Sequence, residues 1–494
     1  MQINSLDLFL TQRRFDLIFK FLYAKDPSNY VKDAYLESIS AFNGFSEEST
    51  NGILKSNPSD FLTSFDTLIN DIKEYGFVPQ QGLLPIGTNG DIIDGAHRLA
   101  ICAAYGINVS TETSHLNALW DYRFFRDNGL RSDIMDFGAL EYVKINPNAY
   151  IVNLQPVTNP EKDNKVVEIL EKYGFVYYEK NCWVTFNGLV NLKKICYGSS
   201  WEKASWIGSV SDGFYGAQDH ASHSMGKNPM RVFIFVCPNI NNVKKAKEEI
   251  RALYGIGNYS VHINDTHEEA ICLAENYFNS NTLFQLNTRP YQFHDKIFEN
   301  HIEYLKLECQ KNDVSTDRIC GAGSTPLNVF HIRHSQDLDY ITIDEKRLPE
   351  NEIISSHNRY QENYPYSIQE IVTNPIFHMY YNGIKFISLD VLYEMKNKRH
   401  EIPKDILDCR KLKHIIFYKK IFNKRVQSKI CKHGRTKIQG KLVALLYKYN
   451  ERFGNKSLKL LSKPTKLSPR ERWRKLKRKF PLIQKAVRIW HSIG

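Results

Sequence analysis

The sequence predicts a multidomain protein that combines α/β and α+β parts. The chain has 494 residues, which is too long for one ordinary hydrophobic core, so we expect two to four domains. Hydrophobic residues make up 42% of the chain and aromatic residues 13%, which is ample for packed cores. Helix-type and strand-type patterns alternate as far as about residue 412, and a basic helical tail follows.

The charge of the chain is unevenly distributed. The formal net charge is +12, but residues 410–494 contain 27 lysines and arginines and only two acids, a net charge of +25. The remaining residues, 1–409, therefore carry a net charge of −13. An acidic body with a strongly basic tail predicts that the tail contacts an anionic partner.

Cysteine usage and hydropathy indicate the compartment. The nine cysteines are scattered and form no Cys-x-x-Cys pair, which is typical of a reducing compartment such as the cytosol. Charged residues interrupt the apolar pattern of residues 1–25, which argues against a secretory signal. Since no run approaches the roughly 20 apolar residues of a spanning helix, we expect a cytoplasmic protein, peripheral on the inner face of the membrane through its tail.

The first predicted domain covers residues 1–150. Apolar spacing predicts a helix over residues 61–75, and residues 83–86 form a short strand-like run. An Asn-Gly pair at Asn89 and Gly90 predicts a hairpin turn before residues 91–93. An alanine-rich helix then opens at the segment Asp94-Gly95-Ala96-His97-Arg98 and stops at Gly106.

The segment from Asp94 to Arg98 has the chemistry of a phosphate-binding turn. Gly95 allows close approach of a ligand to the backbone, and the start of the following helix is electropositive. Arg98 offers a bidentate guanidinium to a phosphate. The alternative is structural: Asp94 caps a helix, and Arg98 pairs with a nearby acid.

These residues resemble the phosphate-binding motif of the ParB/sulfiredoxin-like superfamily, whose members bind a nucleotide at a Gly-x-His-Arg or Gly-x-Arg-Arg turn. The resemblance covers about 35 residues. It implies that Asp94, Gly95, His97 and Arg98 bind a nucleotide or phosphate. The sulfiredoxins place a catalytic cysteine where this chain has Ala96, which argues against that activity. The amino-acid kinases of the superfamily need a carboxylate base, for which Asp94 or Asp91 could serve.

The second predicted domain, residues 151–290, is α+β and of unpredicted role. Strands are expected at residues 231–236 and 259–263, with a helix over residues 243–254. Thr266 and Glu269 form a capping-box pattern before a helix that ends near Phe278. Residues 198–227 are rich in Gly, Ser and His and predict a long irregular loop.

The stretch from His262 to Glu269 is dense in side chains that ligate metals. Capping of the helix explains Asp265 and Thr266, and the helix dipole explains the acids at Glu268 and Glu269. A strand histidine such as His262 is more often structural than a metal ligand. We therefore favour the structural interpretation of this stretch over a metal site.

The third predicted domain, residues 291–412, carries the most informative pattern in the chain. A Gly323-Ser324 turn opens a helix, and a predicted strand then carries Asp337 and Asp339. Because strand side chains alternate, both carboxylates should point to one face and repel each other unless a cation lies between them. Hard oxygen ligands suit Mg²⁺, and the Gly-Ser turn can bring backbone N–H groups to a phosphate.

This arrangement resembles the signature of the polymerase-β-type nucleotidyltransferase superfamily, and residues 313–412 are similar to its minimal members, which have a mixed sheet with helices. The resemblance implies that Asp337 and Asp339 are catalytic and bind Mg²⁺, that Gly323 and Ser324 hold the β/γ-phosphates, and that Lys396 or Lys404 meets phosphate or substrate. The family usually supplies a third carboxylate. Asp344, Glu345 and Asp390 are candidates, and an ordinary strand edge remains the alternative for the acid pair.

The predicted tail, residues 413–494, is helical, basic and amphipathic. Seven lysines and arginines fall within residues 470–479, and Trp473, Leu476 and Phe480 lie on one helical face. A basic, tryptophan-bearing helix predicts contact with an anionic membrane surface. Nucleic acid attracts the same charges and is the less favoured partner, and a solvated helical face is the third interpretation.

Together these features predict a Mg²⁺-dependent nucleotidyltransferase that uses a nucleoside triphosphate and acts on a small phosphorylated or hydroxylated acceptor. The layout resembles accessory enzymes of bacterial surface-polysaccharide biosynthesis. Two alternatives stay open. One is a small-molecule kinase centred on residues 94–98, and the other is a non-catalytic protein that binds a nucleotide or a nucleic acid.

Overall fold

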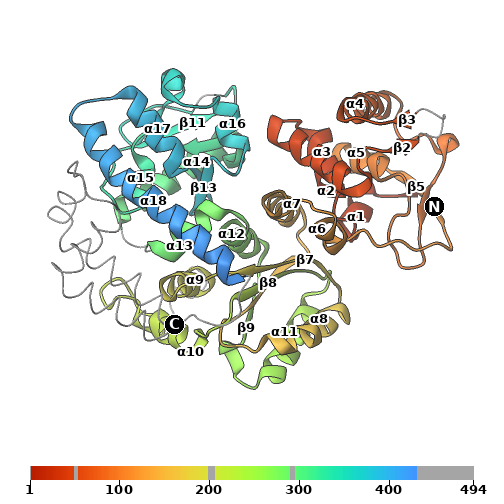
Figure 1. Cartoon of the computed structure of the whole chain (residues 1–494), viewed down its shortest axis with the longest axis horizontal. Helices are drawn as coiled ribbons and strands as arrows, with labels where there is room; N and C mark the ends of the chain where they lie inside the picture. The colour runs from red at the N-terminus through yellow and green to blue at the C-terminus, as the bar shows by residue number, and fades with distance from the viewer. Residues whose placement is uncertain (1, 49–53, 199–205, 290–294, 347, 431–494) are drawn as a thin grey trace, which may run out of the picture. The chain divides into compact units, whose positions relative to one another are not determined.

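Four β-sheets and the helices around them organise the part of the chain that the computed structural model describes, residues 2–48, 54–198, 206–289, 295–346 and 348–430 (Figure 1). Contacts group Met1–Lys432 into one compact unit. The predicted basic cluster and the tail beyond Ile430 lie outside the described residues. The mixture of helices with several small sheets confirms the predicted α/β and α+β class, whereas the two family resemblances and the domain boundaries stay predictions.

The first sheet has the order β1-β5-β4. Strands β1 (Gln2–Ile3) and β5 (Val109–Thr113) are antiparallel, and β4 (Leu84–Ile86) is parallel to β5. A two-stranded sheet, β2 (Glu47–Glu48) with β3 (Leu54–Lys55), lies nearby in the sequence. The helices of this segment are α1 (Ser5–Leu10), α2 (Leu17–Lys25), α3 (Asn29–Asn43), α4 (Pro58–Tyr75), α5 (Ala96–Tyr105), α6 (Tyr122–Asp127) and α7 (Ser132–Ile145), with a 3-10 turn at Pro79–Gln81.

The sequence signals of this segment are confirmed where they are strongest. The helix predicted over residues 61–75 is α4, whose apolar positions Phe61, Phe65, Ile69 and Ile72 are buried. Helix α5 begins after Gly95 and ends at Gly106, as expected. The predicted Asn-Gly hairpin is short: it has one antiparallel bridge, between Ile86 and Ile92, with backbone hydrogen bonds from Gly87 N–H to Asp91 and from Ile93 N–H to Pro85, both at 2.9 Å.

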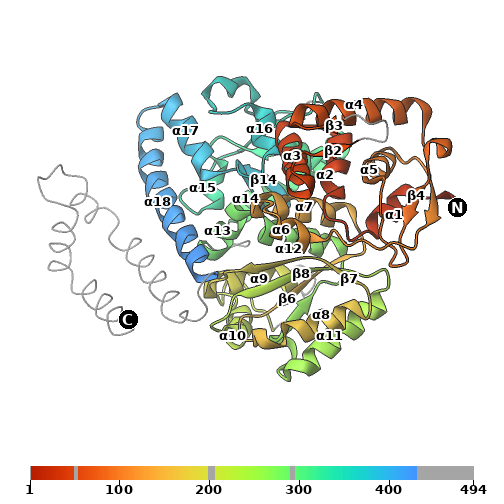
Figure 2. The ribbon, with the colours of Figure 1, turned by 45° about the vertical axis from the view of Figure 1, so that its right-hand side comes forward.

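The second sheet is antiparallel throughout, in the order β7-β8-β6-β9. Its strands are β6 (Ala149–Leu154), β7 (Phe175–Cys182), β8 (Met230–Val236) and β9 (Val261–Ile263). The helices are α8 (Asp163–Glu171), α9 (Phe186–Gly198), α10 (Tyr215–Ser224), α11 (Ile240–Tyr254), α12 (His267–Phe278) and α13 (Ser280–Thr288), with 3-10 turns at Pro160–Lys162 and Gly257–Tyr259. Figure 2 shows α8 and α11 on one face of this sheet and α9 and α12 on the other.

Helix α10 corrects one expectation for this segment. Residues 198–227 were predicted to form a long irregular loop, but Tyr215–Ser224 is helical. The helix buries only its small residues Ala217, Ala221 and Ser224, so its sequence lacks the large apolar stripe by which helices are usually recognised. The predicted strands and helices at β8, β9, α11 and α12 are confirmed.

The third sheet is mixed, as predicted, with the order β12-β11-β10-β14-β13. Its strands are β10 (Ile319–Gly321), β11 (Leu338–Thr342), β12 (Ile354–Ser356), β13 (His378–Tyr381) and β14 (Ile384–Ile387). Strand β10 is antiparallel to β11 and parallel to β14, and β12 is parallel to β11. The helices are α14 (Lys296–Lys311), α15 (Thr325–Val329), α16 (Ile368–Thr373), α17 (Leu389–Arg399) and α18 (Lys404–Ile430), with 3-10 turns at Thr316–Arg318 and Asn358–Asn363.

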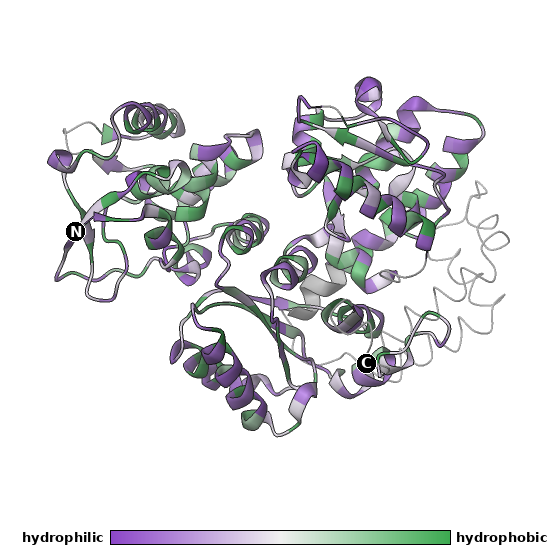
Figure 3. Cartoon of the chain, turned by 180° about the vertical axis from the view of Figure 1, so that it is seen from behind, coloured by the Kyte–Doolittle hydropathy of each residue, from purple (hydrophilic) through white to green (hydrophobic). Residues whose placement is uncertain are grey.

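The helices and strands pack through their apolar residues. All four residues of β13 and of β14 are buried, as expected for strands covered on both faces. Most helices in Figure 3 carry both hydrophobic and hydrophilic residues, as expected for helices that pack along one side. Among the described residues, each helix is too short or too polar to cross a lipid bilayer.

Candidate functional site

The Gly323 turn packs directly against the carboxylate of Asp339. Strand β10 ends at Gly321, α15 begins at Thr325, and the N–H of Ala322 donates to the carbonyl of Asp339 at 2.7 Å. Gly323 has a φ of +56°, and a Cβ atom added to it would lie 1.9 Å from Oδ2 of Asp339. Only glycine combines this conformation with this approach, so the two parts of the predicted motif lie in contact.

The two predicted metal ligands lie at the start of β11. Asp339 belongs to the strand, whereas Asp337 directly precedes its first residue, Leu338, so the strand is shorter than the sequence suggested. Burial, followed by the negative charge of Asp339, raises the pKa of Asp337, while the nearby charges of Lys404 and His301 lower it. The repulsion expected between the two carboxylates is therefore present. Hard oxygen donors with unfavourable mutual charge fit a divalent cation.

The neighbouring strand places a serine beside Asp339. Ser355 is paired with Asp339 in the parallel ladder of β11 and β12, and its hydroxyl donates to Oδ1 of Asp339 at 3.0 Å. The three carboxylates considered from the sequence are engaged elsewhere. Asp344 lies past the far end of β11 at 3.5 Å from Arg318, the adjacent Glu345 is exposed, and Asp390 pairs with Lys419 at 2.7 Å.

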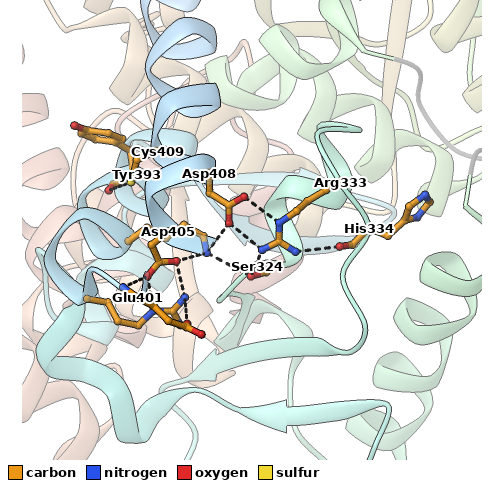
Figure 4. A network of polar contacts seen from close by, with 10 residues as sticks. Ser324, Arg333, His334, Tyr393, Glu401, Asp405, Asp408 and Cys409 are labelled. Carbon is orange, nitrogen blue, oxygen red and sulfur yellow. Dashed lines mark hydrogen bonds and ion pairs between the residues drawn. The ribbon is translucent and has the colours of Figure 1, made fainter. Parts of the chain in front are cut away.

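Ser324 is held by cations that belong to a buried ionic network (Figure 4). Nη2 of Arg333 donates to its hydroxyl at 2.9 Å, and Nζ of Lys396 lies 3.4 Å from the same oxygen. Arg333 also forms a two-point ion pair with Asp408, at 3.0 and 2.9 Å. The basic residue that precedes the acid pair in the sequence is thus bound to both the turn and α18.

Lys396 is completely buried between two carboxylates. Its Nζ lies 3.0 Å from Asp405 and 3.0 Å from Asp408, and all three side chains are at most 3% exposed. Arg399 adds a two-point contact to Asp405, at 2.9 and 2.8 Å. Burial acts to raise the pKa of Asp405, but the hydrogen bonds from Arg399 and Lys396 outweigh it and hold that pKa below its usual range.

The two predicted phosphate-binding lysines therefore occupy different environments. Lys396 touches Ser324, but two aspartates already neutralise its charge. Lys404 is exposed at the first position of α18, close enough to Asp337 for its charge to act on that carboxyl. Of the two, Lys404 is the cation available to an added phosphate.

Tyr364 and His357 form a buried polar pair close to Gly323. The hydroxyl of Tyr364 lies 2.7 Å from Nδ1 of His357. Burial, together with the charges of Arg399 and Arg359, lowers the pKa of His357 to about 4, so this imidazole is neutral at physiological pH. Sequence patterns did not indicate either residue.

His301 is a second residue that the sequence did not indicate. It lies on α14, close enough to Asp337 for the two side chains to interact electrostatically. Its Nδ1 atom is buried and has no hydrogen-bond partner among the described residues. An unsatisfied imidazole nitrogen beside a carboxylate pair is a candidate contact for substrate. It stands on an ordinary amphipathic helix, so only the packing of α14 against β11 reveals it.

The N-terminal turn places a guanidinium where the C-terminal turn places a carboxylate. Gly95 has a φ of +79°, and an added Cβ atom would lie 2.5 Å from Leu84 and 3.0 Å from Nη2 of Arg98. Nη1 of Arg98 donates to the carbonyl of Gly82 at 2.6 Å, and the guanidinium lies 5.8 Å from the ring of Phe77. Within the described residues, Arg98 pairs with a carbonyl and a ring and not with an acid.

The other residues of this motif divide into exposed and buried groups. Asp94 is exposed. It does not cap α5, because the N-cap residue is Gly95, which has no side chain. His97 lies 3.1 Å from the hydroxyl of Tyr35, and burial lowers its pKa well below the usual range. Asp91 is buried and accepts from the backbone N–H and the guanidinium of Arg13. Asp94 is therefore the better placed of the two predicted carboxylate bases.

The structure thus gathers the predicted residues into two sets, one at the Gly323 turn and one at the Gly95 turn. In the described part of the chain, no hydrogen bond or ion pair joins the two sets. Searches of protein-family models, curated proteins and solved structures find no match to this chain.

Proposed function

We propose that the chain is a Mg²⁺-dependent nucleotidyltransferase that transfers a nucleotidyl group from a nucleoside triphosphate to a small phosphorylated or hydroxylated acceptor. The observation that carries the proposal is the direct contact between the Gly323 turn and the Asp339 carboxylate, with Asp337 beside it. A turn that can receive phosphate and a pair of mutually repelling carboxylates meet at one point of the mixed sheet. The resemblance of this pattern to the minimal nucleotidyltransferases supports the same function.

The residues around this point suit a triphosphate. Asp337 and Asp339 would hold Mg²⁺, which neutralises charge on the phosphates when it is bound. Ser324 is oriented by Arg333, and exposed Lys404 can meet a terminal phosphate. In the reaction an acceptor oxygen bonds to the α-phosphorus as the bond from that phosphorus to the leaving pyrophosphate breaks, and a hydroxyl acceptor gives its proton to solvent.

Assays of each nucleoside triphosphate with Mg²⁺, followed by the mass of the product, test the proposal. Release of pyrophosphate should fall by about 10²–10³-fold in Asp339→Asn, because the group that holds the metal is lost. The matched control is Asp344→Asn, at the far end of the same strand, which should keep full activity. Equal activity of wild type and Asp339→Asn would refute this function.

The second candidate is a small-molecule kinase at the Gly95 turn. The arrangement of two residues favours it. Arg98, in the first turn of α5, donates to the carbonyl of Gly82, and the exposed Asp94 lies two residues before Ala96. This candidate predicts release of ADP that is lost in Arg98→Ala and kept in Asp339→Asn. Nucleotide binding without any turnover would indicate the third possibility, a non-catalytic nucleotide- or nucleic-acid-binding protein.

The basic tail extends the proposal to an anionic membrane surface and to polysaccharide biosynthesis at the inner face of a bacterial membrane. The support is the net charge of +25 over residues 410–494 and the Trp473-bearing basic cluster. Full-length protein should float with vesicles that contain anionic lipid, and a chain that ends at Ile430 should not. Equal flotation of both chains would overturn the membrane assignment, and binding of nucleic acid instead would identify the rival partner.

A further inference from the structure

Three elements of the middle segment converge on a buried cluster of metal-type side chains. Cys196 comes from α9, His262 from β9 and Glu269 from the first turn of α12. The thiol, imidazole and carboxylate ligand atoms all lie within 4.8 Å of one another. Cys196 and His262 are buried, and the Glu269 side chain is 13% exposed. The sequence indicated only two of the three, because Cys196 stands far from the His262–Glu269 stretch.

Helix capping does not explain this arrangement. Thr266 caps α12 by accepting from the N–H of Glu269, and Oε2 of Glu269 accepts from the N–H of Asp265 at 3.0 Å. The remaining oxygen, Oε1, turns inward to Nε2 of His262 at 2.7 Å. The start of the helix is therefore satisfied without His262, and the thiol of Cys196 has no part in it.

We propose that Cys196, His262 and Glu269 bind a divalent cation of the zinc class. A thiolate, an imidazole and a carboxylate are the donors that zinc takes in proteins, whereas Mg²⁺ prefers oxygen alone. One thiolate and one carboxylate balance the charge of the cation, which limits the cost of placing it in a buried position. The site is separate from the acid pair at Asp337 and does not depend on the proposed nucleotidyl transfer.

The hydrogen bonds around His262 suit this role. Nδ1 lies 3.2 Å from the hydroxyl of Tyr197, so a proton on Nδ1 can be held there while Nε2 points to the cluster. In the metal-free protein Nε2 and Oε1 of Glu269 lie 2.7 Å apart in a hydrogen bond. Binding of the cation replaces this bond, releases the thiol proton of Cys196 to solvent and leaves one position for water.

Two lysines near the cluster affect the binding of a cation. Lys193, one turn before Cys196 on α9, and Lys247 both act electrostatically on the cluster. Their positive charges oppose a free cation, so the bound unit of cation, thiolate and carboxylate has to be close to neutral. A divalent cation therefore needs two negatively charged ligands, and the thiolate of Cys196 and the carboxylate of Glu269 supply them. Bound metal would fasten α9 and α12 to β9.

Cobalt and zinc titration of the full-length protein tests the site. Protein kept reduced and stripped with a chelator should take up one equivalent of Co²⁺ with a thiolate-to-cobalt absorption band in the near ultraviolet, and Zn²⁺ should displace it while excess Mg²⁺ should not. Cys196→Ser should abolish the band and weaken binding at least about tenfold. The matched control is Cys309→Ser, another buried cysteine, which should bind as wild type.

Glu269→Gln keeps the proposal testable if Cys196→Ser fails to fold. It retains the size of the side chain and a hydrogen-bond partner for His262, yet it removes a negative ligand, so metal affinity should again fall at least about tenfold. Absence of uptake by the stripped wild type overturns the proposal. So does one-equivalent binding that survives in both Cys196→Ser and Glu269→Gln, which would show an adventitious ion elsewhere on the chain.

Discussion

The Gly323 and Gly95 turns use the same backbone geometry to present opposite charges. Each glycine has a positive φ and stands just before a helix. At Gly323 an added side chain would collide with the carboxylate of Asp339. At Gly95 it would collide with Leu84 at 2.5 Å, and the guanidinium of Arg98 lies 3.0 Å away. A phosphate at the first turn needs a cation between it and the protein, whereas the second turn can meet a phosphate directly.

The two turns also differ in how they are held. The C-terminal turn is fastened through Ser324 to a buried network of Arg333, Lys396 and two aspartates of α18. At the N-terminal turn, Arg98 donates to the carbonyl of Gly82 and His97 lies 3.1 Å from the hydroxyl of Tyr35. We therefore expect the first turn to depend on the packing of α17 and α18, and the second to depend on contacts within the N-terminal segment.

The largest effect should follow from loss of the buried lysine. Lys396→Met leaves Asp405 and Asp408 buried beside each other with one cation fewer, so the free energy of unfolding should fall by about 3–5 kcal/mol. Denaturant titration measures this change. Lys398→Met on the same helix removes an exposed lysine and should change stability by less than about 0.5 kcal/mol. Similar, small effects of both variants would show that the network does not support the turn.

Replacing each glycine separately with alanine should distinguish nucleotide binding at the two turns. Gly323→Ala would place a methyl group within 1.9 Å of Asp339, so Mg²⁺-dependent nucleotide binding should weaken about 100-fold. Nucleotide binding in the presence of a chelator, which we assign to the N-terminal turn, should be unchanged in Gly323→Ala. Gly95→Ala should weaken this metal-independent binding and leave Mg²⁺-dependent binding unchanged.

Calorimetry with and without Mg²⁺ provides the measurement. Loss of Mg²⁺-dependent binding in both variants would break the comparison, because it would mean that the two turns form one site. Near-ultraviolet circular dichroism confirms that each variant is folded, so that a local effect is distinguished from unfolding.

The turns and helices that depend on neighbouring residues in the chain were predicted from the sequence. Glycines with positive φ before a helix, and the apolar spacing of α4, α5 and α11, are properties of adjacent residues, so the turns and these helices were correctly placed. The acid pair was found for the same reason, although β11 begins one residue later than Asp337.

The residues that the sequence missed depend on tertiary packing. Ser355 faces Asp339 only because β12 pairs in parallel with β11 in this register. Asp408 meets Lys396 only because α18 packs on α17, and Cys196 reaches His262 only because α9 covers the sheet at β9. Helix α10 escaped prediction because its buried face is made of small residues. None of these contacts has a signature within a short window of sequence.

A smaller effect is expected at the N-terminal turn. Arg98→Ala removes the guanidinium and its bond to Gly82, so binding of inorganic phosphate or nucleotide in the presence of a chelator should weaken about tenfold. Arg98→Lys should restore part of that affinity, since it keeps the charge but not the two-point geometry. Isothermal titration measures both. Unchanged phosphate binding in Arg98→Ala would leave the Gly95 turn with a structural role only.

The smallest effect concerns the pH dependence of stability through Asp337. Burial and the charge of Asp339 raise its pKa in the folded protein, so the folded state binds this proton more tightly than the unfolded state does. Without metal, the ionised carboxylate therefore costs stability at neutral pH, and the cost disappears as the pH falls below the ordinary aspartate value of about 3.9. Asp337→Asn should raise the Tm of the metal-free protein by about 1–2 °C at pH 7.5 and leave it unchanged at pH 3.5.

The same variant should lose the response to metal. Mg²⁺ should raise the Tm of the wild type at neutral pH, because a cation between Asp337 and Asp339 relieves their repulsion, and the rise should vanish as acid protonates Asp337. Asp337→Asn should show no rise, whereas Arg98→Ala should retain it in full. A metal-free Asp337→Asn that is less stable than the wild type, or that keeps the Mg²⁺ response, would mean that the acid pair is an ordinary strand edge and that the two turns do not differ in their need for a cation.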